Sequence, residues 1–137
     1  MSGVFDKTQK ALGAAINFRL LKQNVLNSNV ANAETPGYKA KKLDFEEALS
    51  RAIDNENLGK MHVSNPDHFM MGQGAISRAR ADVYDNPDVV VSNDGNTVNL
   101  EREMAELAEN TILYRAAVKL MNKKLAAMKY AVSEGGR

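Results

Sequence analysis

The two histidines of this 137-residue chain are the side chains best suited to binding a metal ion. His62 and His68 stand six positions apart, and Asp67 adjoins the second. A structural or catalytic zinc site needs three or four ligands at short spacings, and no further ligand follows this pair at such a spacing. The sequence therefore predicts no metal site, and no other cofactor.

Motifs that support catalysis are also missing. The chain has no glycine-rich phosphate loop, no HExxH pair and no nucleophile elbow. Serine, aspartate and histidine occur, but no spacing joins them into a triad. Cysteine is absent, so thiol chemistry and disulfides play no part. We therefore predict no catalytic residues and interpret the chain as a non-enzyme.

Positive charge gathers late in the chain, in Arg115, Lys119, Lys123, Lys124 and Lys129. Such a run serves either nucleic-acid binding or a solvated helix face. The formal net charge is only +1, so no bulk field draws the chain to nucleic acid or to a membrane surface. We favour the solvated face and expect no nucleic-acid partner. No apolar run approaches the ~20 residues that span a bilayer, so we expect no membrane span.

These basic residues belong to a long helix predicted within residues 97–137. Apolar residues recur there at alternating steps of four and three, which is the period of a coiled coil. This predicted seam consists of Leu100, Met104, Leu107, Thr111, Tyr114, Val118, Met121, Leu125, Met128 and Val132. Ile112, Leu113 and Leu120 widen the apolar surface, so the helix needs more than one neighbour. Asn99 is the expected N-cap.

A second long helix is predicted over residues 4–33, and it too is apolar on more than one side. One arc of this helix contains Phe5, Leu12, Ile16, Leu26 and Val30. Another strip includes Ala11, Phe18 and Val25. Two helices alone cannot bury all these faces. Self-association is the simplest remedy, and packing against the middle of the chain is the alternative.

The middle segment, residues 34–96, carries weaker signals. Residues 44–53 are typical of a short amphipathic helix that begins with a capping box. Residues 54–82 show little periodicity, and we expect a loop. An Asp-Gly pair at 94–95 favours a β-hairpin over residues 88–98, since this dipeptide is a strong hairpin signal.

A helix stop and a tight turn follow the first long helix. Pro36 disfavours helix at Thr35, and Pro-Gly suits a type II turn with Gly37 at the position of positive φ. The stretch resembles the N-terminal signature of the bacterial flagellar basal-body rod family. That signature is an Asn-aliphatic-Ala-Asn group, two residues, then Thr-Pro-Gly-Tyr and a basic residue. The matching residues are Asn29, Val30, Ala31, Asn32, Thr35, Pro36, Gly37, Tyr38 and Lys39.

The C-terminal region resembles the second signature of the same family, in residues 98–101, 103–104 and 110–114. Glu34 departs mildly from the first signature, where Asn or Asp is usual. The short length and the lack of a large central domain resemble the proximal-rod members most, and two proteins of that kind fit.

The resemblance implies a fold and a mode of assembly. Residues 1–33 and 97–137 would pair as an inner, polymerising coiled-coil domain, with 34–96 as a small insertion. The protein would pass through the flagellar type III export apparatus without a cleaved signal peptide. It would then assemble helically, with copies of itself and with other rod and basal-body proteins, into the rod that crosses the periplasm.

We therefore expect a mainly α fold. Long N- and C-terminal helices would pair as an antiparallel coiled coil, and a short helix and a β-hairpin would lie between them. The expected function is a structural subunit of the rod. The alternative is a soluble helical adaptor that binds a partner helix in a groove. The side chains expected to pack subunits together are Phe5, Leu12, Ile16, Phe18, Val25, Leu26, Val30, Leu100, Met104, Leu107, Ile112, Tyr114, Val118, Met121, Leu125 and Met128.

Overall fold

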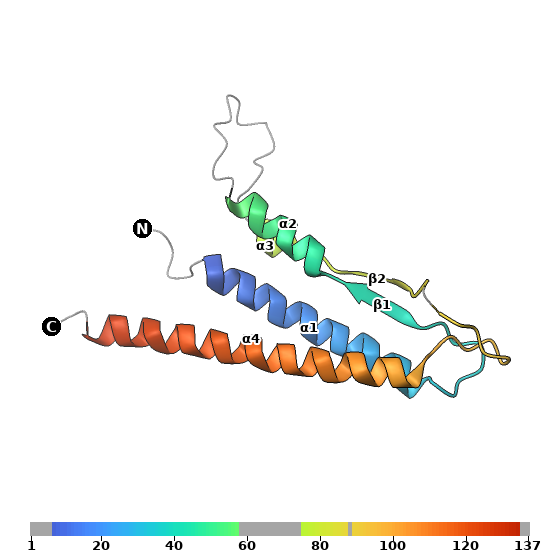
Figure 1. Cartoon of the computed structure of the whole chain (residues 1–137). Helices are drawn as coiled ribbons and strands as arrows, with labels where there is room; N and C mark the ends of the chain where they lie inside the picture. The colour runs from blue at the N-terminus through green and yellow to red at the C-terminus, as the bar shows by residue number, and fades with distance from the viewer. Residues whose placement is uncertain (1–6, 58–74, 88, 135–137) are drawn as a thin grey trace, which may run out of the picture.

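Two long antiparallel helices and a small insertion make up the computed structural model, which describes residues 7–57, 75–87 and 89–134. The elements in chain order are α1 (Lys7–Ala31), β1 (Lys41–Asp44), α2 (Glu46–Asn57), α3 (Ala75–Arg78), β2 (Asp82–Asp85) and α4 (Leu100–Glu134). In Figure 1, α1 lies between α4 on one side and the insertion on the other. The mainly α fold class is confirmed. Phe5, His62, Asp67 and His68 lie outside the described residues.

Local sequence signals explain where the long helices begin and end. Asn99 caps α4, since its Oδ1 accepts from the N–H of Arg102 at 3.0 Å. After α1, the N–H of Tyr38 donates to the carbonyl of Thr35 at 3.2 Å, and Gly37 has a φ of 72°. This is the predicted Pro-Gly turn, with glycine at the position that needs positive φ.

The main apolar core lies between α1 and the insertion. Its buried members are Leu43, Phe45, Leu49, Ala52 and Ile76. The second apolar strip of α1, including Ala11, Phe18 and Val25, packs against this cluster. The rings of Phe18 and Phe45 stack with centroids 5.4 Å apart. The middle of the chain, rather than a second copy, therefore covers this side of α1.

The strands lie elsewhere than expected. β1 and β2 pair antiparallel, with Leu43 opposite Val83, although about forty residues separate them in the chain. The prediction of a hairpin over 88–98 was wrong in its position. The Asp-Gly turn does form, since the N–H of Gly95 donates to the carbonyl of Ser92 at 2.9 Å. Ser92 also donates its N–H to the Asn96 carbonyl across the turn at 2.8 Å. The next residue, Thr97, does not continue this pairing, because it donates its N–H to the Tyr38 carbonyl.

The other boundaries of the insertion also shift. The predicted helix over 44–53 is α2, which starts at Glu46 and continues to Asn57. The predicted loop over 54–82 contains α3, whose Ile76 joins the buried core. Residues 58–74 of that loop lie outside the described part of the chain.

The seam between α1 and α4 is rotated from the predicted one. Six of the ten predicted residues are half-buried, namely Leu107, Thr111, Tyr114, Val118, Met121 and Met128. The positions between them are taken by buried side chains that were not predicted, namely Glu103, Asn110 and Ala117. Leu100, Met104, Leu125 and Val132 are instead exposed. Glu103 and Asn110 can occupy the seam because each finds a hydrogen-bond partner on α1.

Candidate assembly interface

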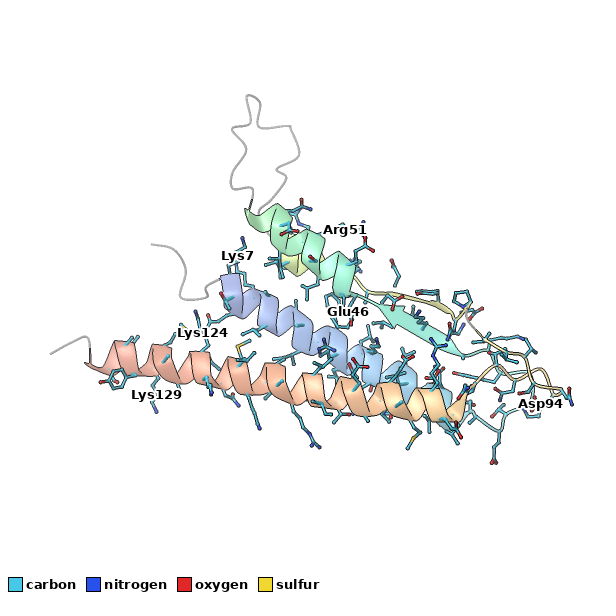
Figure 2. All side chains as sticks on the ribbon, viewed as in Figure 1. Lys7, Glu46, Arg51, Asp94, Lys124 and Lys129 are labelled. Atoms are coloured by element: carbon cyan, nitrogen blue, oxygen red, sulfur yellow. The ribbon has the colours of Figure 1, made fainter. Side chains whose placement is uncertain are left out.

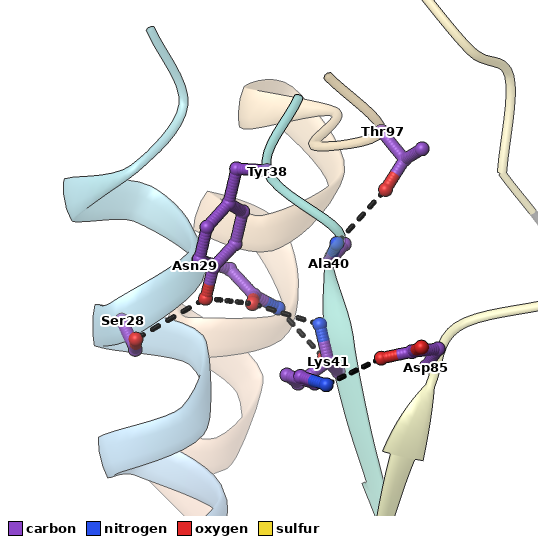
Figure 3. Close-up of polar contacts among 7 residues, drawn as sticks. All are labelled: Ser28, Asn29, Tyr38, Ala40, Lys41, Asp85 and Thr97. Atoms are coloured by element: carbon purple, nitrogen blue, oxygen red, sulfur yellow. Dashed lines mark hydrogen bonds and ion pairs between the residues drawn. The ribbon is translucent and has the colours of Figure 1, made fainter. Parts of the chain in front are cut away.

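Asn29 joins the first signature to the rest of the fold (Figure 3). Its side chain is 0% exposed. The Nδ2 group donates to the carbonyl of Lys41 at 2.7 Å and to Glu103 Oε2 at 2.9 Å. The Oδ1 atom accepts from the N–H of Lys41 at 2.9 Å and from the hydroxyl of Tyr38 at 3.3 Å. One amide therefore ties α1 to β1 and to α4, with both of its donors and both of its acceptor sites used.

Asn96 forms a second polar junction, at the end of α1. Its Nδ2 group donates to the carbonyls of Asn32, Ala33 and Thr35 at 2.8–3.0 Å. Its Oδ1 accepts from the N–H of Val98 at 2.7 Å. The last carbonyls of a helix lack partners within the helix, so Asn96 supplies donors where α1 stops. Sequence reasoning missed this residue, because its partners lie more than sixty positions away.

Two glycines hold the signature turn against the Asp-Gly turn. Gly37 donates its N–H to the carbonyl of Asp94 at 3.0 Å. Gly95 has a φ of 80°, and a Cβ added to it would lie 3.5 Å from the Gly37 Cα. The two turns therefore meet backbone to backbone. The sequence predicted Gly37 at this turn, but not its contact with the second turn.

Outside these turns, one buried hydrogen bond and one exposed ion pair add further links. Thr97 accepts the N–H of Ala40 on its Oγ1 at 2.8 Å, within the buried part of the junction. Lys41 Nζ and Asp85 Oδ1 are 2.5 Å apart at the surface, and this contact raises the pKa of Lys41. Exposed ion pairs contribute little to stability, so we assign the holding role to the buried amides.

Two buried polar residues of α4, Glu103 and Asn110, interrupt the apolar seam of the helix pair by hydrogen-bonding to α1. Glu103 is 5% exposed, and burial raises the pKa of its carboxyl group against the opposing effect of the Asn29 hydrogen bond. Asn110 donates its Nδ2 to the carbonyl of Arg19 at 2.8 Å. Its Oδ1 is the one buried side-chain oxygen or nitrogen without a hydrogen-bond partner in the described ranges. A buried polar residue in a helix seam keeps its hydrogen-bond partner in only one alignment of the two helices, so these two hydrogen bonds fix the register of α1 against α4.

The residues of the first signature have different surroundings. Asn29 is buried, while Val30, Asn32 and Tyr38 are half-buried. The remaining signature residues are exposed, namely Ala31, Thr35, Pro36, Gly37 and Lys39. The structure thus assigns an internal, fold-holding contact to Asn29 and Tyr38, and leaves one side of the turn open to solvent.

The residues predicted to pack subunits together also divide into groups. On α1, Leu26 is buried, and the half-buried residues are Leu12, Ile16, Phe18, Val25 and Val30. On α4 the half-buried residues are Leu107, Tyr114, Val118, Met121 and Met128. The exposed residues are Leu100, Met104, Ile112 and Leu125. Residues of this last group keep 45–67% of their surface exposed, and their contact with another subunit stays a prediction.

Apolar side chains therefore remain uncovered mainly on α4. Among the described elements, α4 packs extensively only against α1. Figure 2 shows side chains projecting from the side of α4 that faces away from α1. Ile112 is 67% exposed and Leu120 is 55% exposed. Large exposed apolar side chains that gather on one helix indicate a surface that contacts another protein. In the described part of the chain, no group of three or more potential metal ligands comes together, and no helix could cross a bilayer.

Comparison with known proteins agrees with an assembly role. Residues 10–39 match the sequence model of a family described as flagella basal body rod protein. A relative from Cereibacter sphaeroides is 39% identical over 118 residues, which cover 86% of this chain and 88% of the relative. A relative from Bacillus subtilis is 32% identical over 138 residues, covering 96% and 98%. One from Salmonella typhimurium is 34% identical over 125 residues, covering 89% of each chain.

All three relatives carry the name flagellar basal body rod protein FlgB. The matched stretch 10–39 contains Asn29 and the turn at Gly37, which the structure places at the junction of α1, β1 and α4. The alignments extend over both long helices and the insertion. The chain belongs to the FlgB family of flagellar basal body rod proteins, structural components of the flagellar basal body.

Proposed function

We propose that this chain is a subunit of the proximal rod, which assembles helically with copies of itself and with other rod and basal-body proteins. In this proposal residues 1–33 and 97–137 form the polymerising domain, and residues 34–96 form an insertion that rests on it. Within the rod family a FlgC-like protein is the alternative, and the FlgB names of the relatives favour the first assignment. Export through the flagellar type III apparatus without a cleaved signal, and a position in the periplasm-spanning part of the rod, belong to the same proposal.

The observation that carries the proposal is the uncovered side of α4. Ile112 and Leu120 of α4 are exposed to water in the single subunit. Burying apolar surface is favourable by about 25 cal/mol for each Å², and this stabilisation is missing while the two side chains stay in water. Contact with neighbouring subunits recovers that free energy. The covered strip of α1 shows the contrast, since the insertion already buries it. Assembly surfaces are therefore expected on α4 more than on α1.

The proposed mechanism is mechanical. A shaft transmits torque only if each subunit moves as one body, so the insertion must not slide on the helix pair. Asn29 and Asn96 oppose such sliding, because both bind the backbone across elements that are distant in the chain. Load applied to α4 by a neighbour would pass through Glu103 and Asn29 to β1.

The test is complementation of a strain that lacks its own copy of this protein. Ile112→Asp should abolish swimming and remove the protein from purified basal bodies, because a carboxylate in a buried interface is strongly unfavourable. The matched control is Asn122→Asp, which adds the same charge at another exposed position of α4. Both purified variants should keep the helical circular-dichroism signal of the parent. Normal amounts of the Ile112→Asp protein in basal bodies would contradict the proposal.

A further inference from the structure

The outer side of α4 carries a stripe with opposite charges at its two ends. The stripe contains Glu101, Glu109, Ile112, Lys119, Lys123 and Tyr130, and all six are exposed. Their spacing follows the helical period, so they share one side of the helix, away from the seam with α1. The four charged members form no ion pair with another described residue. Along the helix axis the stripe is thus acidic, then apolar at Ile112, then basic, and it ends at the aromatic Tyr130.

A shift of 18 residues places two members of this outer stripe opposite matching members of a second copy. Lys119 follows Glu101 by 18 positions, and Tyr130 follows Ile112 by the same number. Eighteen residues are five turns, or about 27 Å along the axis, so each pair points in the same direction. Ile112 and Tyr130 are the two large apolar side chains of this stripe, and they are 67% and 64% exposed. One acid–base pair and one pair of exposed apolar side chains therefore share this spacing, whereas Glu109 and Lys123 meet alanines, Ala127 and Ala105, at the same displacement.

Repulsion between like charges argues against an undisplaced pair of parallel α4 helices. Two parallel α4 helices in register would place Glu101 beside Glu101 and Lys119 beside Lys119. Juxtaposed like charges oppose association, whereas complementary charges select a partner and a register. A displacement of 18 residues removes the repulsion and brings the exposed apolar side chains together.

We propose that a second copy of this chain docks on the outer stripe, with its α4 parallel and displaced by 18 residues. The contact joins the acidic end of one subunit to the basic end of the next. It is head-to-tail, so it can repeat without closing, as a rod requires. This inference rests on the proposed rod function and specifies one contact between copies. An antiparallel pair would also match the charges, but it would close as a dimer.

Disulfide trapping tests the displacement, because the natural chain has no cysteine. Ile112→Cys and Tyr130→Cys are made in separate full-length chains that carry tags of different mass. Mixing the two under mild oxidation should give a mixed disulfide, while each variant alone should give none. Self-disulfides of Ile112→Cys would indicate the in-register or antiparallel arrangement and overturn the proposal. Absence of the mixed disulfide at high protein concentration would overturn it as well.

A charge exchange provides the matched control. Glu101→Lys in both tagged chains should reduce the mixed disulfide toward the level seen in high salt, and Lys119→Glu should do the same. The two changes together restore opposite charges across the contact, so the disulfide should return. Equal yields in all three backgrounds would contradict the role of the stripe. Incorporation into basal bodies is scored separately: a chain that enters basal bodies without this cross-link refutes the displacement alone, while a chain absent from them refutes the rod function.

Discussion

Replacing Asn29 with alanine should destabilise the protein more than any other single change in the signature. The substitution removes an amide that is 0% exposed and makes four hydrogen bonds. It leaves the N–H and carbonyl of Lys41 without their side-chain partner. It also leaves Glu103 Oε2, in a buried setting, without its donor.

The expected cost follows from these contacts. A buried polar group that loses its partner costs about 1–3 kcal/mol, and a charged group more, so the three abandoned groups together should cost roughly 3–5 kcal/mol. A typical domain unfolds with about 5–15 kcal/mol, so much of the stability would be lost. Asn32→Ala is the matched control, three residues further along. Asn32 donates to the Ser28 carbonyl in an exposed setting, and its loss should cost less than ~1 kcal/mol.

Urea unfolding of the purified chain, followed by circular dichroism, measures the difference. With a urea slope near 2 kcal/mol per M, the midpoint of the Asn29→Ala variant should fall by roughly 2 M. The Asn32→Ala midpoint should stay close to that of the parent. Equal midpoints for the two variants would refute the assignment of Asn29 as the junction of α1, β1 and α4.

Three further substitutions test other parts of the fold. Gly37→Val should cost about 1–2 kcal/mol, because its φ of 72° resists a side chain, whereas Lys39→Ala should be near neutral; equal unfolding midpoints would refute the turn. Glu103→Gln should raise the free energy of unfolding at pH 7. Burial lifts the pKa of the Glu103 carboxyl above its usual 4.5, so the natural protein loses stability when this group ionises with rising pH, whereas glutamine stays neutral. The gain should vanish below pH 4.5, and a gain that persists there in urea titrations would show another cause. Leu107→Asp or Met121→Asp should abolish assembly through the half-buried seam, and normal motility of such a strain would contradict this.

The sequence predicted the elements well and the packing of α4 less well. Periodicity located both long helices, Asn99 marked the start of α4, and Pro-Gly marked the turn with Gly37. The rotation of the seam could not be predicted, because apolar periodicity assigns Glu103 to the solvent side. Its burial depends on a donor that lies 74 residues away, on Asn29.

The insertion illustrates the same limit. The Asp-Gly signal predicted a turn correctly, and Ser92 and Asn96 bond across it, but the described residues on either side of them form no strand. Thr97 binds the chain near Tyr38 instead, and β1 finds β2 across a long separation. Asn96 was missed for a related reason, since a turn asparagine gives no sign of the three carbonyls that it binds. Local patterns determine such turns, while long-range hydrogen bonds determine their partners.

The central position of α1 has a consequence for the order of folding. Its partners in the insertion follow soon after it in the chain, whereas α4 begins only at Leu100. Pairing α1 with α4 must close a loop from Ala31 to Leu100, and the entropy of loop closure slows contacts between distant segments. The contacts of α1 with Phe45 and Leu49 can therefore form first, while α4 waits without a partner. Until α4 packs against α1, the hydrogen bond between the Asn29 amide and the Glu103 carboxyl group cannot form, and only the packing of α1 on the insertion is in place.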